Sequence, residues 1–461
     1  MIRIEEQLAP RDLQPFFKEF WRLSGEKLSN TRENFDFSQG SPVFTVNGKY
    51  TTRGWTDWTM GFLYGSSLLQ YEATRDEEFL DMSLEGILEK MGPHLTHTGV
   101  HDHGFNNVSS YGNLRRLLKN GTLPENEWML NFAELALKCS AAVQAGRWTK
   151  TGSLGFIYSF NGPHSLFVDT LRTLRILAIG WFLGHFLYTE NDSKISLLER
   201  LISHARATAL FSVFYGEERD IYDVRGRVAH ESLFNTNDGS FRCTGTQQGY
   251  SNRSTWTRGL AWAILGFSEL LEFIAVVPDE ELAEYGEKEG IESLMMKAAT
   301  AAADFYLKNT PTDGIPYWDT GAPGLRNLEN YLEKPADPFN DFEPVDSSAA
   351  VIAAQGFLRL GRILNMKGMN ELGDKYARCG LLITRTILSD RYLAKDPGHQ
   401  GMVLHSVYHR PNNWDYVPEG KAVPCGESSM WGDYHARELV AFIEHQLKGS
   451  LLTFWGDFPY E

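Results

Sequence analysis

The hydrophobic positions along the chain recur mostly at steps of three and four residues, the spacing of one face of an α-helix. In the segment STWTRGLAWAILGFSELLEFI, these positions are Trp256, Leu260, Ile264, Phe267, Leu271 and Ile274. Similar patterns begin near residues 58, 126, 166, 196, 290, 346, 371 and 431, and weaker ones cover residues 11–28, 77–91 and 104–118. The sequence therefore predicts about a dozen helices spread over most of the chain.

Strand signals are few and short, and the two clearest are ERDIYDV at 218–224 and SVYHR at 406–410. No linker rich in Pro, Gly or Ser separates the helical segments, and no block of charge marks a boundary between them. Helices of this number and kind fit a single toroid of six helical hairpins, an α/α6 barrel, better than three small bundles. The predicted fold class is all-α.

A short pattern that repeats at three helix starts indicates that these starts lie close together. Trp58-Thr59-Met60-Gly61 and Trp256-Thr257-Arg258-Gly259 each open an apolar helix, and Trp431-Gly432-Asp433 opens another. The loops between the helices are dense in Gly, Asn, His, acids and aromatics. Rigid helices that carry such loops at one end are a common way to build a site.

Composition narrows the possible functions. The formal charge of −15 argues against nonspecific binding of nucleic acid, which needs clustered Lys and Arg. The four cysteines lie far apart and form no CxxC motif, so no zinc or redox signature is present. No secretory signal is visible in MIRIEEQLAP and no run of about 20 apolar residues is uninterrupted, so we expect a cytoplasmic protein without a membrane span.

The histidine-rich segment around GVHDHGF raises the question of a metal. His94, His97, His101 and His103 lie close together in sequence, but in an irregular stretch after Gly-Pro and without an HExxH motif or a nearby Cys. Hydrogen-bonded or solvent-facing histidines explain the pattern better than zinc ligands do. We therefore predict no metal and no other cofactor.

Two aspartates stand just before predicted helices. Asp102 precedes Gly104-Phe105, and Asp169 follows Leu166-Phe167-Val168. An N-cap role is the simpler interpretation of both, and the residue pattern favours it for Asp169. The alternative for Asp169 is a desolvated carboxyl whose raised pKa would suit a proton donor near neutral pH.

Arg258 is unusual because it lies within an apolar helix, four residues before Trp262 and on the same face. A buried guanidinium is costly unless it pairs with an anion. Asp346 would supply a structural partner, whereas a bound carboxylate would supply a functional one.

Six segments resemble, in order, those of the unsaturated glucuronyl hydrolases, glycoside hydrolase family 88. They are HDHGF, FVDTLRTL, GTQQGYSNRSTWTRGLAWAILGF, DGIPYWDTGAP, DSSAAVIAAQGFLRL, and HSVYHRPNN with SSMWGDYHARELV, and together they run from about residue 50 to 448. The resemblance implies an α/α6 barrel over residues 51–461, with residues 1–50 as an N-terminal extension packing on it. It also implies exolytic removal of a 4,5-unsaturated uronic acid from the non-reducing end of lyase-generated oligosaccharides.

The resemblance assigns roles residue by residue. Asp169 takes the position of the catalytic acid/base and Asp102 that of the second aspartate. The substrate-binding positions that it implies are His101, His230, Gln248, Arg258, Trp262, Trp58 and Phe160. The expected partner is a small unsaturated oligosaccharide, bound by a monomer or a homodimer.

The sequence departs from the family pattern at His103, where an apolar residue is usual, and at Phe160, where many members have tryptophan. Residues 231–243 and 391–430 also match poorly. Alternative functions are therefore another α/α6-barrel enzyme, such as an unsaturated rhamnogalacturonyl hydrolase or a hydrolase of saturated uronides, and a non-catalytic carbohydrate-binding toroid. The two aspartates argue against the last.

Overall fold

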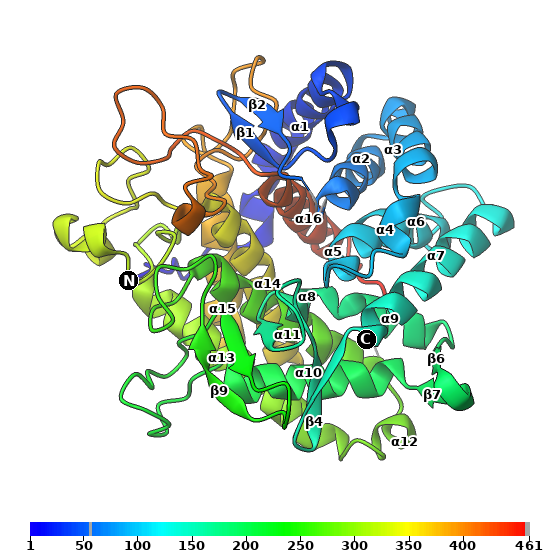
Figure 1. Cartoon of the computed structure of the whole chain (residues 1–461). Helices are drawn as coiled ribbons and strands as arrows, with labels where there is room; N and C mark the ends of the chain where they lie inside the picture. The colour runs from blue at the N-terminus through cyan, green and yellow to red at the C-terminus, as the bar shows by residue number, and fades with distance from the viewer. Residues whose placement is uncertain (55–57, 457–461) are drawn as a thin grey trace.

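The computed structural model describes residues 1–54 and 58–456, and its helices form two concentric rings (Figure 1). The outer ring holds α1 (Gln14–Asn34), α3 (Glu77–Lys90), α7 (Glu127–Gly146), α10 (Leu197–Phe211), α13 (Lys288–Asn309) and α15 (Asn370–Ile387). The inner ring holds α2 (Met60–Thr74), α5 (His103–Asn107) with α6 (Asn113–Lys119), α8 (Thr170–Thr173) with α9 (Arg175–Phe182), α11 (Thr257–Val276), α14 (Ser347–Met366) and α16 (Met430–Leu447). The chain alternates between the rings, so the predicted α/α6 barrel is confirmed.

Burial distinguishes the two rings. In the inner helix α11, every residue from Thr257 to Ile274 is buried. By length and composition α11 is also long and apolar enough to cross a membrane, but 89% of its most apolar window lies inside the protein. The outer helix α10 instead buries one face, with Leu198, Leu201, Ile202 and Ala205 at the helical spacing that the sequence shows.

Helix α1 completes the outer ring. Gln70 Nε2 in α2 donates a hydrogen bond to the Trp21 carbonyl at 3.0 Å, and Arg437 Nε in α16 donates to Ser24 Oγ at 2.7 Å. We predicted that residues 1–50 are an extension packing on the barrel. They do pack on it, but α1 is the outer helix of the first hairpin, so residue 50 does not separate two structural units.

The strands within the described residues are short and form four small antiparallel sheets. These are β1 (Phe44–Val46) with β2 (Lys49–Thr51), β3 (Trp148–Thr151) with β4 (Leu154–Ile157), β6 (Leu187–Thr189) with β7 (Ser193–Ile195), and the sheet β5 (Ser165–Phe167), β8 (Glu231–Phe234), β9 (Phe241–Gly245). The strands predicted at 218–224 and 406–410 do not form, because both segments are turns and irregular backbone.

Further short helical segments join these elements. They are α4 (Gly92–Leu95), α12 (Asp279–Leu282), a π-helical turn at Val108–Gly112, and 3-10 turns at Pro10–Asp12, Phe37–Gln39, Glu190–Asp192, Pro323–Asn327, Tyr331–Glu333 and Arg410–Asn412.

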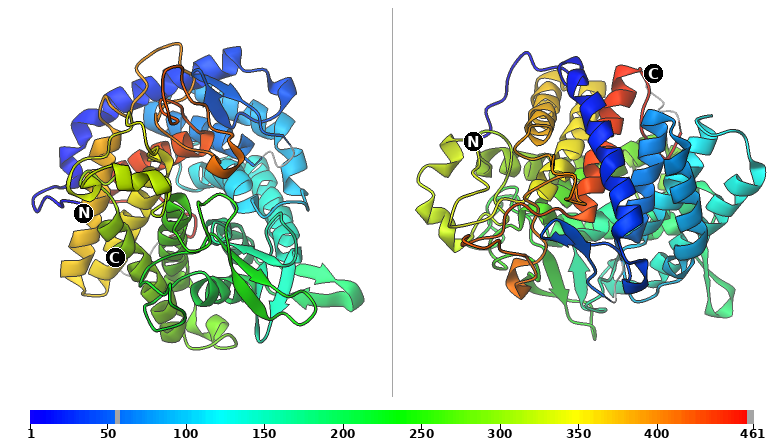
Figure 2. Two further views of the ribbon diagram at one scale, coloured as in Figure 1. Left: turned by 60° about the vertical axis from the view of Figure 1, so that its left-hand side comes forward. Right: turned by 90° about the horizontal axis from the view of Figure 1, so that it is seen from above.

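The β1–β2 hairpin and the long C-terminal loops lie at one end of the helices, as the right-hand view of Figure 2 shows. At this end Trp58 stacks on Trp431, with ring centroids 5.2 Å apart, so the predicted convergence of helix starts is found. Close backbone approach at the same end requires glycine. A Cβ atom on Gly61 would lie 1.9 Å from the carbonyl oxygen of Asn106.

Candidate active site

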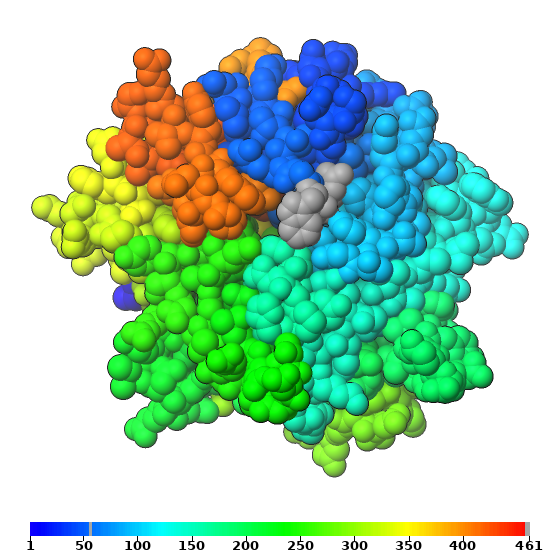
Figure 3. Space-filling model, in the orientation of Figure 1, coloured from blue at the N-terminus to red at the C-terminus, as the bar shows by residue number. Residues whose placement is uncertain are grey.

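A cavity opens at the loop-bearing end of the barrel, where segments distant in sequence meet around the centre of the face drawn in Figure 3. It encloses about 850 Å³ of empty space, part of it open to solvent. Its lining is Arg53, Trp58, His101, Asp102, Phe105, Phe160, Asp169, Gln247, Gln248, Trp256, Arg258, Trp262, Tyr408, His409 and Trp414. All the predicted site residues except His230 therefore border one cavity.

The two aspartates reach the cavity from the starts of neighbouring inner helices. Asp102 immediately precedes α5, and Asp169 lies between β5 and α8. These helices touch through their backbones, since a Cβ atom on Gly104 would lie 2.0 Å from the carbonyl oxygen of Thr173. The glycine of the HDHGF motif thus allows both carboxylates to approach the same point.

His101 lies between the two carboxylates. Its Nε2 atom is 3.3 Å from Asp169 Oδ1 and 3.8 Å from Asp102 Oδ1. His101 is 1% exposed, Asp102 7% and Asp169 8%, so the three groups interact with little screening by water. The structure therefore brings together a triad that spans 68 residues of sequence.

The pKa shifts of the triad follow from burial and from the charges of its three members. Burial raises the pKa of Asp102, and the charge of Asp169 adds to the rise. Burial would also raise the pKa of Asp169, but the hydrogen bond and charge of His101 outweigh this and lower it. Burial opposes the charging of His101, yet the two carboxylates raise its pKa above the usual value. The shifts therefore favour the charged forms of Asp169 and His101.

The structure bears on both interpretations of Asp169, the N-cap role and the raised pKa. Both aspartates occupy N-cap positions, but neither side chain makes a capping hydrogen bond to its helix. The two aspartates thus stand at the predicted N-cap positions, but the hydrogen bonds expected of N-cap side chains do not form. The alternative, a raised pKa, is not found in the free protein either, because a contact with His101 that sequence spacing does not reveal lowers the pKa of Asp169.

His103 has a structural role. His103 Nδ1 hydrogen-bonds with Ser140 Oγ at 2.8 Å, and its Nε2 lies 3.0 Å from the His97 carbonyl oxygen. Burial lowers the pKa of His103 to about 4, so its ring is neutral. Within residues 1–54 and 58–456, no group of three or more His, Cys, Asp and Glu side chains is arranged to hold a metal ion.

His230 is buried and is not among the lining residues of the cavity. Pairing of β5 with β8 brings it beside Asp169, and the Val168 N–H donates to the His230 carbonyl at 2.9 Å. Its Nδ1 accepts the backbone N–H of Gln247 at 3.0 Å, which places the ring proton on Nε2. Burial lowers the pKa of His230 to about 4. Its buried Nε2 has no hydrogen-bond partner among the described residues.

Arg258 forms the buried ion pair that the sequence offered as one alternative. Its Nη1 lies 2.7 Å from Asp346 Oδ2 and also contacts the Val407 carbonyl. Its Nη2 donates to the Tyr408 carbonyl at 2.7 Å and to Gln248 Oε1 at 3.0 Å. The terminal N–H groups are all taken by protein acceptors. The guanidinium therefore anchors the loop of Tyr408 and orients Gln248, and its direct contact with substrate stays a prediction.

Aromatic rings form much of the cavity wall. Trp58 is partly exposed, whereas Trp262 is almost fully buried and packs on Phe105 with ring centroids 4.9 Å apart. Phe160 lies nearly parallel to the His101 ring, 6.0 Å away. Flat apolar faces of this kind suit the faces of sugar rings.

Sequence reasoning did not single out seven of the lining residues, and three of these, Phe105, Gln247 and Trp256, lie within the motifs that it recognised. Tyr408, His409 and Trp414 come from the segment 391–430 that matched the family poorly, and Arg53 precedes the barrel's first inner helix. Asp415 holds the loop by accepting the backbone N–H groups of Tyr408 and His409. Two of these residues, Tyr408 and His409, lie in the recognised motif HSVYHRPNN, whose His and aromatic residues could have indicated a contribution to the site.

Comparisons with known proteins show what the whole chain is similar to. No family model matches the chain. An unsaturated glucuronyl hydrolase of Bacillus sp. strain GL1 is 25% identical over 441 residues, which cover 92% of this chain and 97% of the relative. One from Formosa agariphila is 25% identical over 389 residues, 83% of this chain and 79% of the relative. An unsaturated chondroitin disaccharide hydrolase of Streptococcus pyogenes serotype M1 is 26% identical over 456 residues, 94% and 90%.

Solved structures share the fold. The crystal structure of the Bacillus sp. GL1 hydrolase superposes with a TM-score of 0.68 at 21% identity and covers 92% of this chain and 97% of its own. A heparin-specific unsaturated glucuronyl hydrolase gives a TM-score of 0.69 at 21% identity, with 95% and 99% covered. The resemblance inferred from the six motifs is confirmed.

Proposed function

We propose that this chain, a distant homologue of the unsaturated glucuronyl hydrolases, is an exolytic glycoside hydrolase that removes a 4,5-unsaturated uronic acid from the non-reducing end of lyase-generated oligosaccharides. The observation that carries the proposal is the buried triad of Asp102, His101 and Asp169 on an aromatic-lined cavity. Relatives with this name cover most of the chain at about 25% identity.

The chemistry begins at the C4=C5 double bond of the sugar. Asp169 donates a proton to C4, and the resulting positive charge at C5 is shared with the ring oxygen. Water adds at C5 and returns a proton to the protein. The hemiketal then opens by breaking the bond between C5 and the ring oxygen, which leaves a hemiacetal at C1 that releases the aglycone. No covalent sugar–enzyme intermediate is needed, in contrast to retaining glycosidases.

The triad explains how a carboxylate with a lowered pKa can act as the acid. An unsaturated uronic acid brings its own negative charge into the cavity and displaces water, and both effects raise the pKa of Asp169. His101 Nε2 is 3.3 Å from Asp169 Oδ1, close enough to pass its proton to that oxygen. Asp102 keeps His101 charged until then, because its carboxylate favours the imidazolium.

The test uses the ultraviolet absorbance of the conjugated double bond. We expect absorbance to fall when the protein is added to unsaturated disaccharides that lyases release from chondroitin, hyaluronan, heparin, gellan, xanthan or ulvan. Asp169→Asn should abolish the change, and Asp341→Asn, the same substitution at an exposed position, should leave it intact. Unchanged absorbance across the whole panel with folded protein would contradict the proposal and favour a binding protein or a hydrolase of saturated sugars.

Three finer statements are also proposals. Membership of glycoside hydrolase family 88 rests on the six motifs, with HDHGF and FVDTLRTL now found together on one cavity. Cytoplasmic location and a monomeric or homodimeric state stay predictions, which cell fractionation and light scattering would check.

A further inference from the structure

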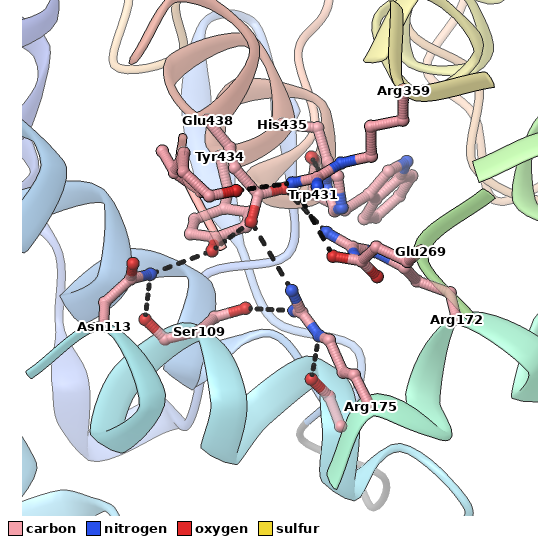
Figure 4. A network of polar contacts seen from close by, with 12 residues as sticks. Ser109, Asn113, Arg172, Arg175, Glu269, Arg359, Trp431, Tyr434, His435 and Glu438 are labelled. Carbon is pink, nitrogen blue, oxygen red and sulfur yellow. Dashed lines mark hydrogen bonds and ion pairs between the residues drawn. The ribbon is translucent and has the colours of Figure 1, made fainter. Parts of the chain in front are cut away.

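A cluster of charged side chains is buried between the inner helices, beyond the residues that line the cavity (Figure 4). It contains three arginines and three glutamates: Arg172, Arg175, Arg359, Glu269, Glu272 and Glu438, none more than 2% exposed. Buried ion pairs are weak evidence for stability, since well-packed apolar residues often serve as well. Such a cluster therefore calls for another explanation, and its contacts supply one.

Arg175 joins three inner elements. Its Nε donates to the carbonyl of Gly104 at 2.9 Å and its Nη2 to Ser109 Oγ at 2.9 Å. Its Nη1 lies 3.4 Å from Glu438 Oε1 in α16. Glu438 is itself fixed, since Tyr434 donates to Oε1 at 3.0 Å and Arg172 Nη2 lies 2.7 Å from Oε2.

These contacts link the two segments that carry the aspartates. Gly104 is two residues after Asp102 in the chain, and Arg175 is six residues after Asp169. Arg172, three residues after Asp169, is tied to the same Glu438 and to Glu269 in α11. One guanidinium thus bonds the Asp102 segment to the Asp169 segment, and both to α16.

We infer that Arg175, anchored by Glu438, is a positioning residue that sets the distance between Asp102 and Asp169 across His101. The planar guanidinium presents donors in three directions, toward Gly104, Ser109 and Glu438. Lysine carries the same charge, but its compact ammonium lacks the planar fork that reaches these three separated acceptors. The role in turnover rests on the proposed function, whereas the role in geometry does not.

The experiment compares Arg175→Lys with Arg359→Lys. Arg359 belongs to the same cluster, where it pairs with Glu272 and donates to the Leu452 carbonyl, but it contacts neither aspartate-bearing segment. For Arg175→Lys we expect kcat to fall about a hundredfold while KM changes less than about threefold, as for a small displacement of reacting groups. Arg359→Lys should lower the melting temperature similarly but keep kcat within about twofold.

A second readout does not depend on turnover. The pKa of His101, measured by NMR and assigned by comparison with His101→Asn, reports the distance of both carboxylates. It should fall in Arg175→Lys, because the carboxylates raise it in the native arrangement, and stay unchanged in Arg359→Lys. Wild-type protein without activity on any unsaturated sugar would refute the proposed function, yet this comparison would still decide the inference.

The inference is overturned if folded Arg175→Lys keeps both native kcat and the native His101 pKa, or if both arginine variants lose kcat in proportion to their melting temperatures. If Arg175→Lys does not fold, Ser109→Ala replaces it, since this removes one acceptor of the same guanidinium. We then expect a loss of kcat of about fivefold with a fall in the His101 pKa. Absence of both effects would again overturn the inference.

Discussion

Replacing Arg258 tests whether its guanidinium holds other protein groups in place or binds the substrate directly. Its Nη1 lies 2.7 Å from Asp346 Oδ2, and both residues are at most 2% exposed. Truncation to alanine leaves a buried carboxylate without its cation, which costs about 3–5 kcal/mol. Asp346 still accepts the Ser348 N–H at 3.1 Å, so we expect the lower end of that range.

The same cost can be expressed as a change in melting temperature. An unfolding entropy of about 2.1 cal/mol/K per residue gives roughly 1 kcal/mol/K for the 461-residue chain. Arg258→Ala should therefore lower the melting temperature by about 3 °C. Arg258→Lys keeps the charge but not the contacts to both Tyr408 and Gln248, so we expect a smaller decrease.

Activity should fall in parallel, because the loop of Tyr408 and the Gln248 side chain lose their anchor. We expect kcat/KM of Arg258→Ala to decrease at least about tenfold. Asp346→Asn should cause a comparable loss, and the double variant should be little worse than either single one, since both changes remove the same contact. Thermal unfolding and the decrease in ultraviolet absorbance measure the two quantities.

The opposite pattern would refute this reasoning. If Arg258→Lys lowered kcat/KM strongly at unchanged melting temperature while Asp346→Asn had little effect, the guanidinium would be binding the carboxylate of the substrate directly.

Three further predictions concern the triad and the absence of a metal. Asp169→Asn should reduce kcat by at least about a hundredfold at near-native melting temperature, and ordinary turnover by the folded variant would remove this residue from its role. Asp102→Asn should lower the pKa of His101, because the Asp102 carboxylate raises it in the native protein. The alkaline limb of the pH profile of kcat/KM should therefore move to lower pH. Superimposable profiles of the variant and the wild type would contradict this. Dialysis against a strong chelator should leave activity unchanged, and a loss that a divalent ion restores would revive the metal interpretation of the histidine-rich segment.

The helices were predictable because their burial follows one local rule. Apolar residues at steps of three and four mark the buried face of each outer helix, and nearly continuous apolar runs mark inner helices such as α11. Helix α1 was recognised as a helix, but not its place in the ring, because its packing on α2 and α16 joins residues up to 413 positions apart.

The two strands predicted at 218–224 and 406–410 do not form, for a physical reason that the amino-acid composition does not reveal. Residues 218–224 are rich in strand-forming side chains, yet the Asp223 carboxylate accepts the backbone N–H groups of Tyr215, Gly216, Glu217 and Arg219 and closes a loop. Asp415 does the same for Tyr408 and His409. In both places a carboxylate accepts backbone N–H groups and holds the chain in a loop.

At the site, too, features that depend on local sequence were predicted, and those that depend on contacts between distant segments were not. The motifs located Asp102 and Asp169, and their places before helices made a capping role reasonable. The protonation state could not be predicted, because it depends on His101 Nε2 lying 3.3 Å from one carboxylate and 3.8 Å from the other. That geometry requires α5 and α8 to touch at Gly104 and Thr173. The acid function proposed for Asp169 therefore depends on the packed pair of helices rather than on either motif.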